Sequence, residues 1–407
     1  MDTTLTHLKK LFPASCHGRI FLVGGCVRDH LLARLHMDID LVAALTVGEL
    51  VTCGFRLVEG KSTTPIWFRH EQEFGIIEVT QLTDSGALHQ DLERRDFTIN
   101  AMAMDLEGGL HDPLGGRSDL SHGTLRACSR HSFESDPLRI FRAFRFEADG
   151  WLMNRESEAL IRKRDWSDSL EQIPVERFSR ELLKACSAPE PERFFLRMHE
   201  FAVGHCYLPE LFSMPAIPAG PLEHHPEGDL LTHSIQVLQR IAQRTDDPLS
   251  RFCAFFHDLG KLASDPNCYP RHHGHDEAGF DLARAFCHRL RLPASYRTAL
   301  SWVSRLHGIL NRWSELRDTT RLRTAEQALK AGISTILPLV SAADKVDSGE
   351  LSGWLRAVEV VRMTTAELGI DQQRLEGMPP QFRSDFILQK KVEKFRTICI
   401  AQHGGNT

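Results

Sequence analysis

The sequence predicts an α/β segment at residues 1–125 followed by an all-α remainder. Short apolar runs bounded by glycine indicate strands between residues 19 and 125. After about residue 126 the strand signals fade, and apolar residues recur at helical spacing instead. The length of 407 residues corresponds to two to four domains, each large enough to bury its own core.

The α/β segment begins with the apolar strand RIFLV at residues 19–23. Gly24 and Gly25 then precede a short amphipathic helix that ends near Leu35, and a strand follows at 39–42. Further strands are predicted near residues 65–70 and 74–80.

Long helices are predicted beyond residue 126, in DPLRIFRAFRFEA and in VERFSRELLKAC. Prolines and glycines interrupt this periodicity between residues 209 and 228, which predicts a linker. Helical segments resume over 229–350, in LLTHSIQVLQRIAQR, RFCAFFHDLGKL and LPLVSAADKV.

Composition excludes several classes of protein. The ten cysteines form no C-x-x-C pair, which favours a reducing, cytoplasmic location over a disulfide framework. The amino terminus has no apolar signal-peptide core, and no uninterrupted apolar run is long enough to span a membrane. The net charge of −5 gives no support to nucleic-acid binding, but it leaves a local basic groove open.

A first candidate site begins at the glycine pair, where a strand-to-helix turn lets backbone N–H groups approach a phosphate. Asp38 and Asp40 alternate in MDIDLV, so a strand would place both carboxylates on one face, as Mg²⁺ binding requires. Glu78 could supply a third carboxylate if its strand lies beside that of Asp40. The alternatives are a plain structural turn, an exposed strand face and a solvated edge charge.

Arginines follow downstream. Arg95, within ERRDFTINAMAMD, is expected at a helix start together with Arg94 and Asp96. The helix predicted after Pro137 carries arginines three residues apart, at positions 139, 142 and 145. Guanidinium groups at this spacing can hold a triphosphate, although a solvated helix face is the alternative.

The order of these motifs is distinctive: VGGCVRD, MDID, RRDFTINAMA, DPLRIFRAFR and VERFSRELLK, within residues 19–212. It resembles the bacterial tRNA nucleotidyltransferase and poly(A) polymerase family, on the class II branch of the polymerase-beta-like superfamily. The resemblance implies an α/β polymerase-beta-like nucleotidyltransferase head at 1–125, followed by an all-α neck and body at 126–212 that reads the base and binds RNA.

The resemblance also assigns residues by matching position. Asp38 and Asp40 would bind the catalytic Mg²⁺ ions, and Asp136 with Arg139 would read the base of CTP or ATP by imitating a Watson–Crick partner. The residues implied to contact the nucleotide are Gly25, Arg28, Arg95, Arg142 and Arg145.

Two departures from the family pattern stand out. Ser135 occupies a position where the family usually has Glu beside the base-reading Asp. The interval from Glu78 to Arg95 is short and lacks the flexible loop that is associated with switching from C to A addition. The short interval therefore predicts weak or absent addition of the terminal A, as in CC-adding relatives.

A second candidate site lies in CAFFHDLGK, where His257 and Asp258 stand side by side in an expected apolar helix. Charged groups in such surroundings need a partner or a metal. His233 on the preceding helix and Asp344 on a later one could complete four ligands, a set that suits Ni, Mn, Fe or Zn. Structural histidines are the alternative.

This H…HD…D set resembles the HD-domain phosphohydrolases, and PRHHGHDEAG strengthens a match to the HD domain of multifunctional CCA proteins. The resemblance implies an HD helical domain at 213–350, a helical tail at 351–407 and hydrolysis of phosphomonoesters or 2′,3′-cyclic phosphodiesters. His273 and His275 either contact a second metal or phosphate or are exposed loop histidines.

Against the short interval, the HD-domain resemblance favours a complete CCA enzyme in which other neck residues make the switch from C to A. The leading hypothesis is therefore metal-dependent, template-independent addition of C and A to the 3′ end of tRNA, with HD-domain hydrolysis as a further activity. Three alternatives stay open: a CC-adding enzyme, a poly(A) polymerase, and an HD phosphohydrolase whose amino-terminal module only binds RNA. The sequence does not fix the oligomeric state.

Overall fold

We analysed a computed structural model, which describes residues 2–34, 39–58, 65–72, 75–345 and 351–403. The chain divides into two compact units, Met1–Leu170 and Glu171–Thr407. This division falls inside the neck and body segment that the sequence predicts at 126–212, so the predicted boundaries at residues 125, 212 and 350 stay predictions.

The first unit contains a mixed sheet whose described strands follow the order β3-β4-β5-β2-β1-β6-β7. Only β2 and β5 pair in parallel, and the other neighbours are antiparallel. The strands are β1 (Ile20–Val23), β2 (Ile39–Ala43), β3 (Arg56–Leu57), β4 (Ile66–Glu71), β5 (Gly75–Gln81), β6 (Ala103–Asp105) and β7 (Leu110–His111). The predicted mixed α/β head is thus confirmed.

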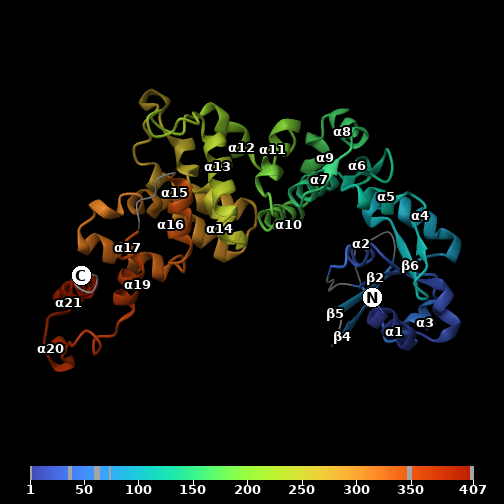
Figure 1. Cartoon of the computed structure of the whole chain (residues 1–407), viewed down its shortest axis with the longest axis horizontal. Coiled ribbons are helices and arrows are strands. Elements are labelled where there is room, and N and C mark those ends of the chain that lie inside the picture. Colours follow the sequence, from blue (N-terminus) through green and yellow to red (C-terminus); the bar gives the residue numbers. More distant parts are fainter. Residues whose placement is uncertain (1, 35–38, 59–64, 73–74, 346–350, 404–407) are drawn as a thin grey trace. The chain divides into compact units, whose positions relative to one another are not determined.

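Short helices connect these strands (Figure 1). They are α1 (Asp2–Leu11), η1 (Ala14–Arg19), α2 (Gly25–Leu31), α3 (Val47–Thr52), η2 (Ser85–Ala87), α4 (Leu88–Glu93), η3 (Thr98–Asn100) and α5 (Gly116–Ser121), where η marks a 3₁₀ turn. The β1–α2 turn and the β2 strand agree with the sequence prediction.

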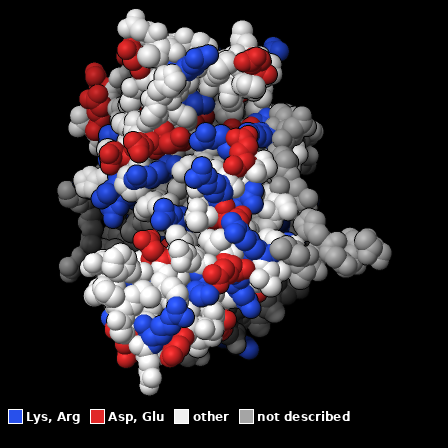
Figure 2. Space-filling model, turned by 90° about the vertical axis from the view of Figure 1, so that its left-hand side faces the viewer, with Lys and Arg blue, Asp and Glu red and all other residues white. Residues whose placement is uncertain are grey.

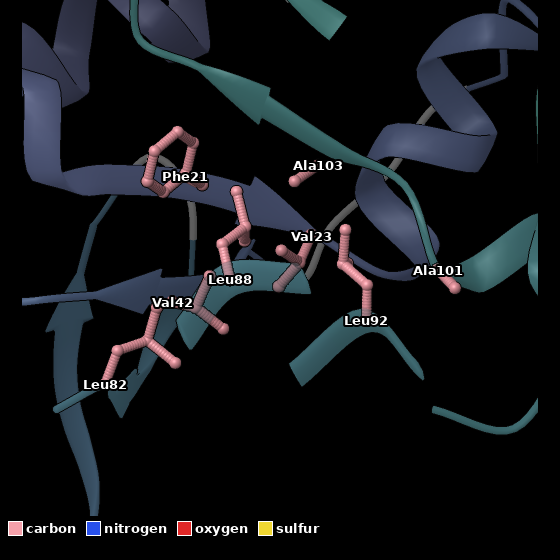
Figure 3. Close-up of a cluster of buried hydrophobic side chains, with 8 residues drawn as sticks. All are labelled: Phe21, Val23, Val42, Leu82, Leu88, Leu92, Ala101 and Ala103. Carbon is pink, nitrogen blue, oxygen red and sulfur yellow. The ribbon is translucent and has the colours of Figure 1, made fainter. Parts of the chain in front are cut away.

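An apolar cluster joins α4 to one face of the sheet (Figure 3). Leu88 and Leu92 of α4 pack with Phe21 and Val23 of β1 and with Val42 of β2. Side chains two residues apart in a strand share a face, so Asp40 lies on the same face as Val42. The cluster therefore fixes the end of α4 close to the carboxylate of β2.

The rest of the first unit is mainly helical, with one short strand pair that the sequence analysis missed. The strands β8 (Thr124–Leu125) and β9 (Leu152–Met153) pair in parallel, and α7 lies between them in the sequence. Two residues per strand are too few to show an alternating pattern. The helices are α6 (Ser132–Ser135), α7 (Leu138–Ala148), α8 (Arg155–Arg162) and α9 (Ser167–Glu171).

The described elements of the second unit are helices, as predicted, apart from one isolated β-bridge (Figure 1). Its α-helices are α10 (Val175–Cys186), α11 (Glu192–Phe201), α12 (Pro209–Ser213), α13 (Leu230–Ala242), α14 (Pro248–Phe256), α15 (His275–Arg289), α16 (Ala294–Leu310), α17 (Asp318–Lys330), α18 (Ile336–Asp344), α19 (Trp354–Arg362), α20 (Gln372–Glu376) and α21 (Pro380–His403). Its 3₁₀ turns are η4 (Met214–Ala216), η5 (Leu259–Ala263), η6 (Pro266–Cys268) and η7 (Trp313–Glu315).

Phenylalanines form the centre of this unit. Phe195 of α11 stacks on Phe255 of α14, and Phe256 packs against Phe286 of α15. Arg251 of α14 is fully buried and donates hydrogen bonds to backbone carbonyl oxygens at, or just after, the ends of α10 and α13. These contacts hold α14 in place, so that its carboxyl end presents the HD residues to the surrounding helices.

The segment predicted as a linker is more ordered than expected. It contains the short helix α12 and the turn η4, and Pro218 forms a β-bridge with Asp229 at the start of α13. Lys261 donates a hydrogen bond to the carbonyl oxygen of Ala219 at 2.7 Å. This proline- and glycine-containing segment is therefore a packed part of the second unit.

Among the described residues, no helix combines the length and the apolar character that crossing a membrane requires. Figure 2 shows one face of the molecule, on which Lys and Arg side chains are interspersed with Asp and Glu. Ion pairs on the last helices, such as Lys390 with Glu393 and Arg396 with Asp318, agree with this mixed pattern.

Candidate nucleotide site and candidate metal centre

A pair of carboxylates lies on the parallel strands of the sheet. Asp40 of β2 is directly beside Glu78 of β5 in the register of the two strands. Partial burial and the negative charge of Asp40 raise the pKa of Glu78. Glu78 was predicted as a third carboxylate on the condition that its strand lies beside that of Asp40, and the sheet meets this condition. The other predicted carboxylate, Asp38, lies outside the described residues.

The glycine turn brings two further groups to this pair. Gly24 has a positive φ of 77° and caps α2, and a Cβ there would lie 3.2 Å from Arg95 Nη1 and 3.4 Å from Asp40 Oδ2. A Cβ on Gly25 would lie 3.7 Å from Arg28 Nη2. A bare backbone at this turn thus gives a ligand access to a carboxylate and two guanidinium groups.

A buried network holds the arginines in place. Arg28 Nη1 donates to Asn100 Oδ1 at 2.7 Å, and Asn100 Nδ2 donates to Asp96 Oδ1 at 3.1 Å. Arg142 Nη2 and Nε donate to Asp96 Oδ2 at 2.6 and 2.9 Å. Although burial raises the pKa of Asp96, Arg142 and these hydrogen bonds bring it below its usual value. Asn100, four residues after Asp96 in the same motif, was not predicted as a site residue.

The helix start expected around Arg95 is wrong. The helix α4 ends at Glu93, and Arg94 and Arg95 follow its last turn. Arg95 pairs back with Asp91 one turn earlier, at 3.0 Å. Asp96 accepts the backbone N–H of the next residue, Phe97, and only the single 3₁₀ turn η3 follows. These charged residues therefore follow the carboxyl end of α4 and do not begin another α-helix.

Arg139 is bound to the backbone that carries Arg95. Its guanidinium donates to the carbonyl oxygens of Arg94 at 2.6 Å and Arg95 at 3.1 Å, and to Ser132 Oγ at 2.9 Å. Asp136 Oδ1 accepts a hydrogen bond from the backbone N–H of Leu138, the first residue of α7, at 3.3 Å. The structure thus places the two predicted base-reading residues at the amino end of one helix.

Arg145 lies on the same helix, one turn beyond Arg142. It pairs with Asp149 at 2.9 Å, and its guanidinium lies 4.2 Å from the centre of the Phe146 ring. Burial raises the pKa of Asp149 although Arg145 opposes this change. The predicted arginine row therefore exists, and each of its members has a partner within the protein.

The four residues predicted for the second site converge in the helical unit. His233 lies on α13, Asp344 ends α18, and His257 and Asp258 follow directly after α14. His233 Nε2 is 3.0 Å from Asp344 Oδ1 and 3.6 Å from Asp258 Oδ2. His257 Nε2 is 3.2 Å from Asp258 Oδ2 and 3.5 Å from Asp344 Oδ1. The side chains are at most 9% exposed.

The outward nitrogens of both histidines have acceptors. His233 Nδ1 is 2.6 Å from Glu227 Oε1, and His257 Nδ1 is 2.8 Å from the carbonyl oxygen of Ala254. We therefore assign the proton of each neutral imidazole to Nδ1. The Nε2 atoms are then lone-pair donors, and they make no hydrogen bond in the described part of the chain. Two such nitrogens facing two carboxylates could hold a metal ion, and the candidate ligand atoms of His233, His257 and Asp258 lie within 4.8 Å of one another.

The two carboxylates of this cluster favour positive charge on their neighbours. Although burial lowers the pKa of His257, the negative charges of Asp258 and Asp344 raise it to about 10. The pKa values of both carboxyl groups fall well below the usual range, because the attraction of His257 outweighs their burial. The carboxylates thus attract positive charge, which a divalent metal ion would supply.

Sequence reasoning missed two residues around Asp258. His307 Nε2 of α16 is 3.2 Å from Asp258 Oδ1, and Lys261 Nζ is 2.7 Å from Asp258 Oδ2. Lys261 belongs to the same HDLGK motif and could have been found there, whereas His307 is a single histidine in a long helix with no motif around it.

The histidines of PRHHGHDEAG have different environments. His275 Nε2 is 3.7 Å from Asp258 Oδ1, so this residue lies at the cluster. His272 instead binds Ser264 and the carbonyl oxygen of Pro218, and His273 is exposed outside the groups of candidate ligand atoms.

Glu227 provides the first test. Glu227→Gln is expected to weaken metal binding by about 10- to 100-fold, because the carboxylate fixes the His233 tautomer that presents Nε2 to the metal. Calorimetric titration with Mn²⁺ measures this. The matched control is Glu223→Gln, four residues earlier and exposed. Equal affinities in the two variants would show that Glu227 has no part in metal binding.

Two family models match the chain. The poly(A) polymerase head domain model matches residues 67–126, and the HD domain model matches residues 230–349. These ranges contain Glu78 and Arg95 of the first site and all four predicted ligands of the second.

Curated relatives extend the similarity over most of the chain. A multifunctional CCA protein of Methylococcus capsulatus is 33% identical over 392 residues, covering 88% of this chain and 91% of the relative. Another from Shewanella denitrificans is 35% identical over 319 residues, covering 74% of this chain and 77% of the relative.

Solved structures share the fold. A CCA-adding enzyme in complex with CTP matches with a TM-score of 0.62 and 22% identity, over 93% of this chain and 87% of that one. The Thermotoga maritima CCA-adding enzyme complexed with tRNA gives the same TM-score and coverage at 23% identity.

Proposed function

This chain belongs to the multifunctional CCA protein family, and from that membership we propose that it adds C and A to the 3′ end of tRNA. The reaction takes CTP and ATP and uses no nucleic-acid template. The observation that carries the proposal is the meeting of Asp40, Glu78, Arg95 and the glycine turn in a head of the matching fold.

The carboxylates of the head fit Mg²⁺, since it prefers oxygen ligands. Asp38 and Asp40 would hold the metal, with Glu78 as a further ligand. A Mg²⁺ ion held by these carboxylates would supply activation of the terminal ribose 3′-hydroxyl and neutralisation of the charge on the leaving pyrophosphate.

The protein's own groups orient the nucleotide. The triphosphate lies along the Gly25 turn beside Arg28 and Arg95, and the Asp96 network keeps Arg28 and Arg142 in fixed positions. Fixed donors lose little freedom when the nucleotide binds, so that more of their attraction for phosphate appears as affinity. Arg145, the last of the three arginines on α7, would also contact the nucleotide.

Asp136 and Arg139 read the base. A site that hydrogen-bonds the correct base rejects another one by leaving buried polar groups unpaired. Arg139→Ala is therefore expected to reduce selectivity for CTP over UTP by about 10-fold or more, each factor of ten being about 1.4 kcal/mol. Incorporation assays with each nucleotide measure the ratio. An unchanged ratio at a lower rate would assign Arg139 to phosphate binding or to the fold.

The terminal A distinguishes the complete enzyme from a CC-adding one. Only the turn that contains η2 separates β5 from α4, so the described connection is as short as the sequence indicates. The relatives are named CCA proteins, which does not favour the CC-adding alternative. We expect a tRNA that ends in CC to gain one A from ATP alone. Accumulation of CC ends despite excess ATP would establish the alternative.

The remaining alternatives predict different products. Extension of unrelated RNA by ATP alone would indicate a poly(A) polymerase, and absence of any incorporation would leave an RNA-binding module beside a hydrolase. The name of the relatives favours neither. The helices that follow the head would bind tRNA mainly through its phosphates and shape.

The second activity of the proposal is hydrolysis of phosphomonoesters or 2′,3′-cyclic phosphodiesters at the HD centre. The unpaired Nε2 atoms of His233 and His257 and the carboxylates of Asp258 and Asp344 fit a divalent transition metal such as Ni, Mn, Fe or Zn. Such a metal lowers the pKa of bound water and polarises a phosphoryl oxygen.

A further inference from the structure

We propose that the base of the last tRNA nucleotide stacks on Phe68 of β4, and that Arg56 of β3 binds a phosphate of the RNA that precedes this nucleotide. Neither residue was predicted as a site residue. The proposal rests on the nucleotide addition proposed above and deepens it, because it names the surface that holds the attacking end of the RNA.

The strand register puts four residues in one row across the sheet. Asp40 of β2 is paired with Glu78 of β5, Glu78 with Phe68 of β4, and Phe68 with Arg56 of β3. Residues paired across neighbouring strands point to the same face. Phe68 is therefore next to Glu78 and two strand spacings, about 10 Å, from Asp40.

The face that carries this row is covered by α4 at one end and open at the other. At Phe21 and Val42 the leucines of α4 pack on the face, and both residues are buried (Figure 3). In the row of Asp40, by contrast, Phe68 is 38% exposed, and Glu78 and Arg56 are exposed as well. The row is thus accessible to a ligand.

The apolar residues of these strands differ in exposure between the two faces. Trp67, Ile77 and Val79 point to the opposite face and are at most 4% exposed. On the open face, Ile76 lies two residues before Glu78 and is 51% exposed, diagonally across from Phe68. Exposed apolar residues are common on protein surfaces. Their place beside the carboxylates is what indicates a ligand here.

The geometry of the reaction places the RNA over this part of the sheet. The glycine turn after β1, with Arg95 beside it, would hold the triphosphate on one side of Asp40, whereas β5, β4 and β3 lie on the other side. In phosphoryl transfer the attacking and leaving oxygens are roughly in line through the phosphorus. The 3′-hydroxyl therefore approaches from the side of β5, and the base of its own nucleotide then lies over β4.

The chemistry of the two side chains fits this occupant. An aromatic ring stacks on any base, because every base has a flat π-face. The last base of the tRNA differs from one addition to the next, so that a contact without base preference suits it. Arg56 ends the row with a positive charge, which suits the phosphates of the RNA.

Primer kinetics on the full chain test the proposal. Phe68→Ala is expected to raise the KM for tRNA about 10-fold or more, because stacking on an aromatic side chain contributes this much to the binding of a base. The rise should occur with tRNAs that lack three, two or one of their last nucleotides. The KM for the incoming CTP or ATP should stay within a few fold, since the triphosphate is bound on the other side of Asp40.

Two further variants separate stacking from general packing. Phe68→Tyr keeps the ring and should have the parental KM for tRNA, whereas Phe68→Leu keeps an apolar side chain without a ring and should behave like Phe68→Ala. The matched control is Leu57→Ala, which removes an exposed apolar side chain of β3 that points to the opposite face. It should retain the parental KM, and circular dichroism verifies the fold of each variant.

A tRNA whose last nucleotide lacks its base identifies the contact. The parent should use this tRNA with a KM raised as in Phe68→Ala, and Phe68→Ala should raise that KM no further. Arg56→Gln should instead raise the KM for tRNAs with and without the last base, and should weaken its dependence on salt concentration.

The possible outcomes are distinct. A parental KM for tRNA in Phe68→Ala, or an equal effect of this variant on tRNAs with and without the last base, would overturn stacking on Phe68 and leave the nucleotidyltransferase intact. An unchanged KM and salt dependence in Arg56→Gln would overturn the phosphate contact. Absence of incorporation by the folded parent would overturn the proposed nucleotide addition itself, and the RNA surface with it.

Discussion

Asp40→Ala is expected to lower nucleotide addition by about 10³-fold or more, a rise of about 4 kcal/mol in the activation barrier. The carboxylate is fixed on β2, between β1 and β5, and lies at the glycine turn near Arg95, where a metal-bound triphosphate would meet it. Incorporation of labelled CTP into a tRNA lacking its last three nucleotides measures the loss.

The matched control is Asp84→Ala, which removes an exposed carboxylate from the connection after β5. That variant should keep its rate within a few fold, and both variants should retain hydrolysis by the HD centre. Glu78→Gln then shows whether the neighbouring carboxylate also binds the metal. Parental incorporation by Asp40→Ala in Mg²⁺ would remove Asp40 from the catalytic role.

The second large effect concerns the HD centre. His257→Gln and Asp344→Asn are each expected to lower metal-dependent hydrolysis of a 2′,3′-cyclic phosphodiester by about 10³-fold, because each removes one ligand of the metal. Nucleotide addition should stay within a few fold of the parent, since the two sites use separate residues. Both activities are assayed on one preparation, with His273→Ala as the control.

Loss of both activities in a folded variant would contradict this separation. It would mean that the HD helices serve the nucleotidyltransferase reaction or the fold. Loss of neither would assign the buried cluster a structural role.

The sequence predicts the first site well where the signal is local. The alternation of MDIDLV and the glycine pair depend only on neighbouring residues. The adjacency of Asp40 and Glu78 depends instead on β5 pairing with β2 after β3 and β4 have intervened. Periodicity gives the face of a strand but neither its partner nor its register. The sequence could therefore predict a place for Glu78 beside Asp40 only as a condition on the strand order.

The helical site shows the same limit. His257 and Asp258 are adjacent in the chain and form a recognisable pair, whereas His307 joins them only because α16 packs against α15. The expected helix start at Arg95 failed for a related reason. A run of charged residues fits either end of a helix, and the pairing with Asp91 decides between the ends.

The connection before α13, at residues 209–228, determines where a fragment containing the HD domain can begin. Its Glu227 and Ala219 bind side chains of the HD cluster, His233 and Lys261 respectively. A fragment that starts at Leu230 would carry the HD motif without these two contacts. An isolated or transplanted HD domain should therefore begin upstream of η4. Replacement of the connection by a flexible glycine-serine linker would remove the contacts of Glu227 with His233 and of Ala219 with Lys261.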